Sequence, residues 1–100
     1  MWSVYMIRCG DDSLYTGISN NVAKRFAVQK SGSAKAAKYT RYRHPLRLVF
    51  SAKIGTRSDA SRVEYNLKQL TKKNKEKLVA GTISLSDLGL TENLIDLLHE

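Results

Sequence analysis

The chain has 100 residues and a mass of 11.3 kDa, a length that accommodates one domain with one hydrophobic core. Hydrophobic residues make up 42% and charged residues 26%, so the composition is that of a folded soluble protein and excludes wholesale disorder and fibrous repeats. The formal net charge is +8 and no apolar run is long enough to cross a bilayer, which excludes a membrane-spanning chain and favours a polyanionic partner.

The first ten residues and the cysteine content indicate the compartment. Arg8 and Cys9 lie where a secretory leader would have its apolar stretch, so no leader is expected. Cys9 is the single cysteine, and it can form neither an internal disulfide nor a zinc site with the two histidines of the chain. We therefore expect a cytoplasmic protein in a reducing environment.

The chain begins with the pattern of a β-hairpin. Residues 2–8 alternate between two sides that both carry large side chains, which predicts a strand buried on both faces. Residues 10–13 (GDDS) are typical of a turn, and residues 14–16 resume a strand that Gly17 is expected to end.

A helix and a third strand are predicted next. Residues 19–21 (SNN) offer N-cap side chains for a helix over residues 22–27. The small and polar residues 31–37 predict a loop, and Pro45 marks the entrance to an alternating strand over residues 46–53.

The second half of the chain is predicted to be helical. Thr56 and Asp59 have the spacing of a capping box at the start of one helix, and a second short helix is expected after Thr71, ending at Gly81. The leucine spacing in residues 85–98 predicts a C-terminal helix that packs back on the sheet.

This order of elements, β-β-α-β-α-α, implies an α+β fold with a small three-stranded mixed sheet flanked by helices. We assign residues 1–80 to the main domain and residues 81–100 to a helical extension packed on the same domain.

The positive charge is concentrated in one part of the chain. Residues 24–77 contain 16 basic and 3 acidic residues, whereas residues 81–100 contain four acidic residues and no lysine or arginine. Such a block repels itself unless a polyanion binds, and nucleic acid is the commonest polyanion. The alternative is a well-solvated basic surface; membrane binding is not expected, because no segment combines the lysines with a broad apolar face.

Common catalytic motifs are absent, but two tyrosines on the paired strands stand out. Val4-Tyr5-Met6, Tyr15-Thr16-Gly17, Arg25 ten residues after Tyr15, and the helical Glu64 together resemble the GIY-YIG endonuclease domain. Residues 37–41 and 48–50 further resemble its small single-domain YhbQ-type branch. The resemblance covers about residues 2–80, so it implies a GIY-YIG-like nuclease domain over residues 1–80.

The resemblance implies a metal-dependent endonuclease that hydrolyses phosphodiester bonds in DNA, an activity of the kind used in DNA repair. Tyr15 would accept the proton of the attacking water and Tyr5 would support that water. Arg25 would clamp a phosphate oxygen with its planar guanidinium, and Gly17 would let the backbone turn tightly beside the phosphate, where a Cβ would collide. Glu64 would hold one divalent ion, Mg²⁺ or Mn²⁺, since Mg²⁺ binds through few protein carboxylates.

Two physical expectations accompany these roles. A phenol with a pKa near 10 is a poor base at neutral pH, so Arg25, the metal and the basic surroundings are expected to favour the phenolate of Tyr15. Glu64 borders an apolar helical stripe, so a metal or an arginine such as Arg57 or Arg62 is expected beside it.

Further basic and aromatic residues are candidates for nucleic-acid contacts, because cations bind phosphates and aromatic rings stack on unpaired bases. They are Lys24, Lys35, Lys38, Tyr39, Arg41 and Arg43. The sequence offers no targeting domain, so the substrate is expected to be recognised by its backbone or shape, or with a protein partner that supplies specificity. The oligomeric state stays open.

Two positions depart from the family pattern. Many relatives have a histidine or tyrosine four residues after the arginine, whereas this chain has Gln29, which cannot titrate. Ile18 stands where some branches have a lysine. Two alternatives therefore remain, a non-catalytic nucleic-acid-binding module and a structural or protein-binding role. For single residues, the alternatives are that Tyr5 is an ordinary cross-strand aromatic and that residues 39–43 form a solvated loop.

Overall fold

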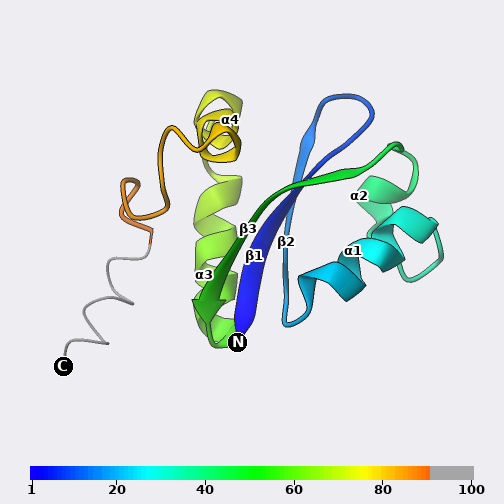
Figure 1. Cartoon of the computed structure of the whole chain (residues 1–100), viewed down its shortest axis with the longest axis horizontal. Helices are drawn as coiled ribbons and strands as arrows, with labels where there is room; N and C mark the ends of the chain where they lie inside the picture. Colours follow the sequence, from blue (N-terminus) through cyan, green and yellow to red (C-terminus); the bar gives the residue numbers. More distant parts are fainter. Residues whose placement is uncertain (91–100) are drawn as a thin grey trace.

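A three-stranded antiparallel sheet forms the centre of the computed structural model, which describes residues 1–90 (Figure 1). Its strands are β1 (Trp2–Arg8), β2 (Leu14–Ser19) and β3 (Arg47–Gly55), in the spatial order β2-β1-β3. The α+β class is confirmed, but the mixed sheet is wrong, because both neighbouring pairs are antiparallel. The chain crosses from β2 to the far side of β1 before it forms β3, so the two strands that run in the same direction are separated by β1.

The hairpin is longer than its sequence suggested. β2 runs through Gly17 to Ser19 and does not end at the glycine, and Tyr5 of β1 pairs with Gly17 across the hairpin. The register therefore brings both tyrosine motifs to the same region of the sheet.

Four helices follow in residues 1–90, and their capping residues explain where they begin. Asn21 accepts a hydrogen bond from the Lys24 amide, and Thr56 and Asp59 complete the predicted capping box. The last helix ends where Gly81 adopts a left-handed conformation, as predicted. The helices are α1 (Val22–Ser31), α2 (Lys38–Arg41), α3 (Arg57–Lys68) and α4 (Lys72–Ala80).

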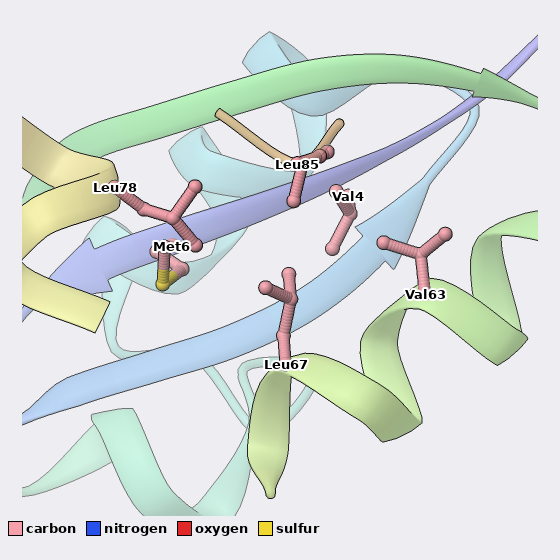
Figure 2. Close-up of a cluster of buried hydrophobic side chains, with 6 residues drawn as sticks. All are labelled: Val4, Met6, Val63, Leu67, Leu78 and Leu85. Carbon is pink, nitrogen blue, oxygen red and sulfur yellow. The ribbon is translucent and has the colours of Figure 1, made fainter. Parts of the chain in front are cut away.

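The two faces of the sheet carry separate hydrophobic clusters, because successive residues of β1 point to opposite faces. Helices α3 and α4 cover one face, where Figure 2 shows the side chains of Val4, Met6, Val63, Leu67, Leu78 and Leu85 packed together. Helix α1 covers the other face, over Tyr5, Ile7, Cys9 and Leu46, with Tyr15, Val22 and Phe26 packed beside them. The prediction that β1 is buried on both faces is confirmed.

The segment after α4 differs in part from the expected C-terminal helix. Residues 85–90 form turns, and Leu85 is buried in the cluster on the α3–α4 face. Residues 91–98 of the predicted helix lie outside the described part of the chain.

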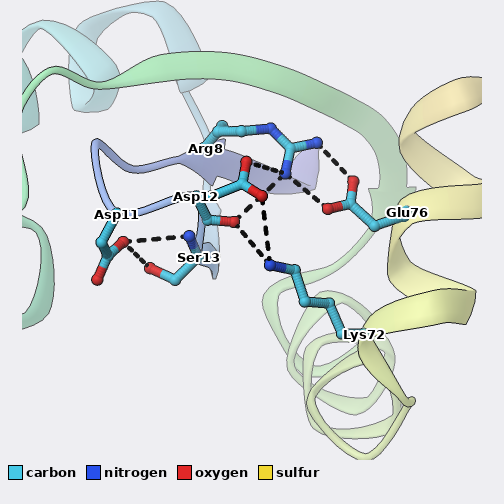
Figure 3. A network of polar contacts seen from close by, with 6 residues as sticks. All are labelled: Arg8, Asp11, Asp12, Ser13, Lys72 and Glu76. Carbon is cyan, nitrogen blue, oxygen red and sulfur yellow. Dashed lines mark hydrogen bonds and ion pairs between the residues drawn. The ribbon is translucent and has the colours of Figure 1, made fainter.

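An ion-pair network joins the hairpin turn to α4 (Figure 3). The guanidinium of Arg8 donates to both carboxylate oxygens of Glu76, at 2.7 and 2.5 Å, and a second acceptor is Asp12 at 3.3 Å. The ammonium of Lys72 lies 3.5 Å from the same Asp12 carboxylate. These contacts fix α4 next to the hairpin.

No helix in residues 1–90 has the length and apolar character needed to cross a membrane.

Candidate active site

The ring of Tyr5 lies directly across Gly17. Tyr5 is 1% exposed at the centre of β1, and a Cβ atom at position 17 would stand 2.6 Å from its phenol oxygen. A side chain at position 17 would therefore displace the tyrosine. The collision that requires glycine here is with Tyr5, inside a regular strand, and the backbone makes no turn at this position.

Tyr15 is the half-buried tyrosine of the pair. Its ring centroid lies 6.4 Å from that of Tyr5 and 5.9 Å from that of Tyr39, on which it stacks. Burial raises the pKa of Tyr15 above the ordinary phenol value, and Tyr5 and Glu64 act in the same direction, while Arg25 and the amide of Gln29 lower the pKa.

This electrostatic environment has two consequences. The groups of the predicted catalytic set lie within electrostatic reach of one phenol, from three different elements: β1, α1 and α3. The expectation that Arg25 and the basic surroundings would favour the phenolate is only partly correct, because desolvation outweighs the effect of Arg25 in the protein alone.

Arg25 projects from the first half of α1. Its guanidinium donates a 2.8 Å hydrogen bond to the Lys35 carbonyl, so the loop after α1 holds the arginine in place. It also borders a hollow of about 270 Å³ at the end of β2, lined by Ser19, Asn20, Asn21, Lys24, Arg25 and Val28.

Gln29 is the residue whose contribution the sequence interpretation missed. It is fully buried, and its amide nitrogen lies 3.4 Å from the phenol oxygen of Tyr5, to which it donates. Its amide oxygen accepts from the Ala37 backbone at 2.8 Å and from the Thr40 hydroxyl at 2.6 Å. The burial of Gln29 could have been predicted from its position seven residues after Val22, which places it on the buried stripe of α1.

Glu64 reaches the site from α3. Its side chain is 24% exposed, and its carboxylate lies 3.6 Å from the ammonium of Lys68. The predicted arginine neighbours are wrong: Arg62 pairs with Asp59 at 2.8 Å and Arg57 lies over the ring of Trp2. Residues four apart share a helix face and residues two apart do not, which is why Lys68 and not Arg62 reaches the glutamate.

Lys68 connects the glutamate to a second hollow, at the other end of β2. This hollow measures about 250 Å³ and is lined by Leu14, Tyr15, Thr16, Tyr39, Lys68 and Lys75. Because β2 is an edge strand with α1 and α3 both packed against it, residues from the two sides of the sheet meet along its free edge.

The six candidate nucleic-acid contacts differ in how available they are. Lys24, Lys35 and Lys38 are exposed. The Arg41 guanidinium donates to two loop carbonyls, and that of Arg43 pairs with an aspartate of the hairpin turn and lies 3.9 Å from the centroid of the Tyr39 ring. Both arginines therefore hold the loop and α2 in place, and the lysines are the charges with exposed side chains.

The donor set at Glu64 suits a hard cation. In residues 1–90, no group of three His, Cys, Asp or Glu side chains could enclose a metal by itself. Mg²⁺ is commonly bound through one or two carboxylates with its remaining positions filled by water and phosphate oxygens. A single partly exposed carboxylate beside a basic hollow fits that mode of binding.

The comparisons with known proteins identify the family of the chain. Residues 1–77 match the model of the GIY-YIG catalytic domain. The chain belongs to the GIY-YIG family. This confirms the family resemblance drawn from the tyrosine motifs, and membership of this family suggests a nuclease.

The relatives of this GIY-YIG chain place it in one branch. It is 54% identical to a UPF0213 protein of Cronobacter sakazakii over 83 residues, 83% of this chain and 85% of the relative. It is 48% identical to the UPF0213 protein YhbQ of Escherichia coli over 87 residues, 87% of this chain and 85% of that protein. The solution NMR structure of the UPF0213 protein BH0048 from Bacillus halodurans is similar, with a TM-score of 0.50 and 42% identity over 80% of this chain and 84% of that one. These names confirm the YhbQ-type branch and state no activity.

Proposed function

We propose that this chain is a divalent-metal-dependent endonuclease that hydrolyses phosphodiester bonds in DNA. The observation that carries the proposal is the surroundings of Tyr15: Tyr5, Arg25 and Glu64 all act on the charge of this one phenol, although they come from three elements. A surface that only bound nucleic acid would not need two phenols, a guanidinium and a carboxylate around a half-buried oxygen.

The residues divide the reaction as follows. The oxygen of a water attacks phosphorus, and the proton of the water passes to the phenolate of Tyr15. The bond from phosphorus to the leaving oxygen breaks, and that oxygen keeps the electron pair of the bond and takes a proton from solvent water. Tyr5, held across Gly17, hydrogen-bonds and orients the water. The planar fork of Arg25 clamps a non-bridging phosphate oxygen, in exchange for its present bond to the Lys35 carbonyl.

Glu64 would hold the Mg²⁺ or Mn²⁺ ion, which when bound supplies neutralisation of the phosphoryl oxygens. Its partly exposed carboxylate is accessible to such an ion, because it pairs with a Lys68 side chain that is 52% exposed and easily displaced.

The basic surface would hold the DNA through the phosphates of the DNA backbone, since the exposed candidates are lysines, which are flexible point charges that bind phosphates. Sequence or structure preference would then come from DNA shape or from a protein partner.

A second candidate, a nucleic-acid-binding module without turnover, is favoured by one observation. Burial raises the pKa of Tyr15, so the protein alone holds little phenolate at neutral pH, and Gln29 cannot transfer a proton in its place.

A cleavage assay separates the two candidates. Purified protein is incubated with Mg²⁺ or Mn²⁺ and with supercoiled, linear, branched and single-stranded DNA. We expect Glu64→Gln and Tyr15→Phe to lose cleavage and to retain DNA binding. Tyr65→Phe is the matched control, because Tyr65 is an exposed phenol on α3, and it should cut like the wild type. Cleavage by Glu64→Gln at the wild-type rate would reject the nuclease proposal, and binding without cleavage of any DNA form would favour the binding module.

A further inference from the structure

Two basic hollows lie at opposite ends of β2. One, at the Ser19 end, contains Lys24 and Arg25, and the other, at the Leu14 end, contains Lys68 and Lys75. The six residues of β2 span about 17 Å, which corresponds to roughly five nucleotides of a strand along the axis of B-form DNA. Tyr15 lines the hollow at the Leu14 end, whereas Arg25 lines the hollow at the Ser19 end, so Arg25 accounts for a phosphate contact at only one of them.

The hollow at the Leu14 end is lined by two lysines, and only Lys68 has an ion-pair partner within residues 1–90. Glu64 faces Lys68, but Lys75 makes no ion pair in residues 1–90, although its side chain is half-buried. Two lysines that line one small hollow concentrate positive charge there, and a bound anion such as a phosphate would offset that charge.

The lysines of α4 are not equivalent, and this makes the feature testable. Three residues apart on a helix, Lys72 and Lys75 face the same side, where Lys72 meets the hairpin turn (Figure 3). Lys73 and Lys77 are two residues from Lys75, about 200° around the helix, and both are exposed and outside the hollow. Substitutions of Lys73 and Lys77 on the same helix can therefore serve as controls for a substitution of Lys75.

The walls of the hollow indicate which part of a nucleic acid it would take. The Tyr39 ring is already stacked on Tyr15 and in contact with the Arg43 guanidinium, so it forms a wall and is not a free platform for a base. Leu14 adds an apolar surface to the two ammonium groups. Apolar walls with two cations suit a sugar and its phosphate.

We propose that Lys68 and Lys75 form a backbone-binding subsite that holds the sugar–phosphate chain of the substrate at the Leu14 end of β2, next to Tyr15 and on the side of the reacting phosphate that Arg25 does not clamp. The inference rests on the proposed function, because it deepens the same site. The DNA strand would run along the free edge of β2. Lys75 would contribute to DNA binding and would take no part in the chemical step.

The test measures DNA binding without metal, so that it does not depend on cleavage. Fluorescence anisotropy of a labelled oligonucleotide is followed over a series of salt concentrations in EDTA, for the wild type, Lys75→Ala, and the controls Lys73→Ala and Lys77→Ala. Each phosphate contact contributes about 0.7–0.9 to the slope of log affinity against log salt. We expect Lys75→Ala to lower the slope by that amount, Lys68→Ala/Lys75→Ala by about twice as much, and the controls to leave it unchanged.

The outcomes distinguish this inference from the proposed function. If Lys75→Ala loses no more of the slope than Lys73→Ala, the subsite is wrong even where the wild type cleaves DNA. If the slopes differ as expected and the wild type never cleaves, the subsite stands and the nuclease proposal falls. With an active wild type, Lys75→Ala should raise KM and leave kcat unchanged, since its contact is the same in ground and transition states. A fall in kcat alone would contradict the role assigned to Lys75.

Discussion

The amide nitrogen of Gln29 lies 3.4 Å from the phenol oxygen of Tyr5, and both side chains are buried. The same amide accepts two hydrogen bonds from the segment around α2. One glutamine thus links the hairpin that carries the tyrosines to the segment that supplies Lys35, the partner of Arg25. In the sequence, Gln29 marked only the lack of a titratable side chain, whereas in the structure it connects the hairpin to the segment around α2.

Replacement of Gln29 by leucine should therefore destabilise the fold. The substitution leaves the Ala37 amide and the Tyr5 phenol without this partner, and the Thr40 hydroxyl keeps only its second acceptor, the Ala37 carbonyl. A buried polar group left unpaired costs about 1–3 kcal/mol. We expect a loss of at least about 2 kcal/mol in the free energy of unfolding, measured in urea. Gln69→Leu is the control, because Gln69 is the other glutamine of the chain and is exposed. Equal effects of the two substitutions would contradict the role of Gln29.

A methyl group at position 17 should disturb Tyr5 specifically. The Cβ of Gly17→Ala would lie 2.6 Å from the phenol oxygen and 2.7 Å from the adjoining ring carbon, and Tyr5 has no space to move because it is buried. We expect Gly17→Ala to lower stability by about 1–3 kcal/mol. In a Tyr5→Leu background the same substitution should cost much less, so a double-mutant cycle gives a large coupling energy. Additive effects would show that the collision is not with Tyr5.

Much of the fold could be predicted because its signals are local. Turn residues 10–13, the Thr56–Asp59 capping box and the glycine at position 81 each fix a boundary through the backbone of a few neighbouring residues. The antiparallel character of the whole sheet could not be predicted in this way. It depends on which side of β1 receives β3, and that choice is set by the packing of two helical layers.

In the candidate site, too, residues that belong to a local motif could be predicted, and contacts that depend on packing could not. Tyr5, Tyr15, Arg25 and Glu64 could be named from motif spacing, because the resemblance supplied the positions. The neighbour of Glu64 was misassigned, although helical geometry favours Lys68 at four residues over Arg62 at two. The contribution of Lys75 could not be seen at all, because it depends on the ion pairs that place α4 beside the hairpin.

Those ion pairs should make stability depend on pH. The hydrogen bond from Arg8 lowers the pKa of Glu76 below the ordinary value of a glutamate. A carboxyl whose pKa is lower in the folded state stabilises the protein above its unfolded pKa, and this contribution is lost as the pH falls through the folded pKa. We expect Glu76→Gln to remove about 1 kcal/mol at pH 7, a modest value because Glu76 is about one-third exposed.

Thermal unfolding of the wild type and Glu76→Gln from pH 3 to pH 7 measures this difference. The two melting temperatures should converge at the acidic end, because protonated Glu76 no longer pairs with Arg8. Asp87→Asn is the control, as Asp87 is an exposed carboxylate outside the Arg8 network. A difference between wild type and Glu76→Gln that persists unchanged at pH 3 would contradict the ion-pair explanation.

Lys68 should compete with the divalent ion for Glu64. Its ammonium lies 3.6 Å from the carboxylate, so a bound cation must displace it. An exposed pair of this kind contributes about 0.2–1 kcal/mol, and we therefore expect Lys68→Ala to raise the affinity for Mn²⁺ by up to about fivefold. Mn²⁺ titration followed by electron paramagnetic resonance measures the affinity without DNA. Lys73→Ala should change it little, and weaker binding of Mn²⁺ to Lys68→Ala would contradict the competition.

The pH dependence of cleavage should identify Tyr15 as the proton acceptor. Burial raises the pKa of this phenol, so at neutral pH only a small fraction is the phenolate that acts as base. Because that fraction increases tenfold for each pH unit below the pKa, the single-turnover rate should rise with a slope of about one between pH 6 and pH 8. Tyr15→Phe should retain at most a low residual rate that lacks this slope, whereas Tyr65→Phe should follow the wild type. An intact slope in Tyr15→Phe would assign the titration to another group, such as a metal-bound water, and would remove Tyr15 from the role of base.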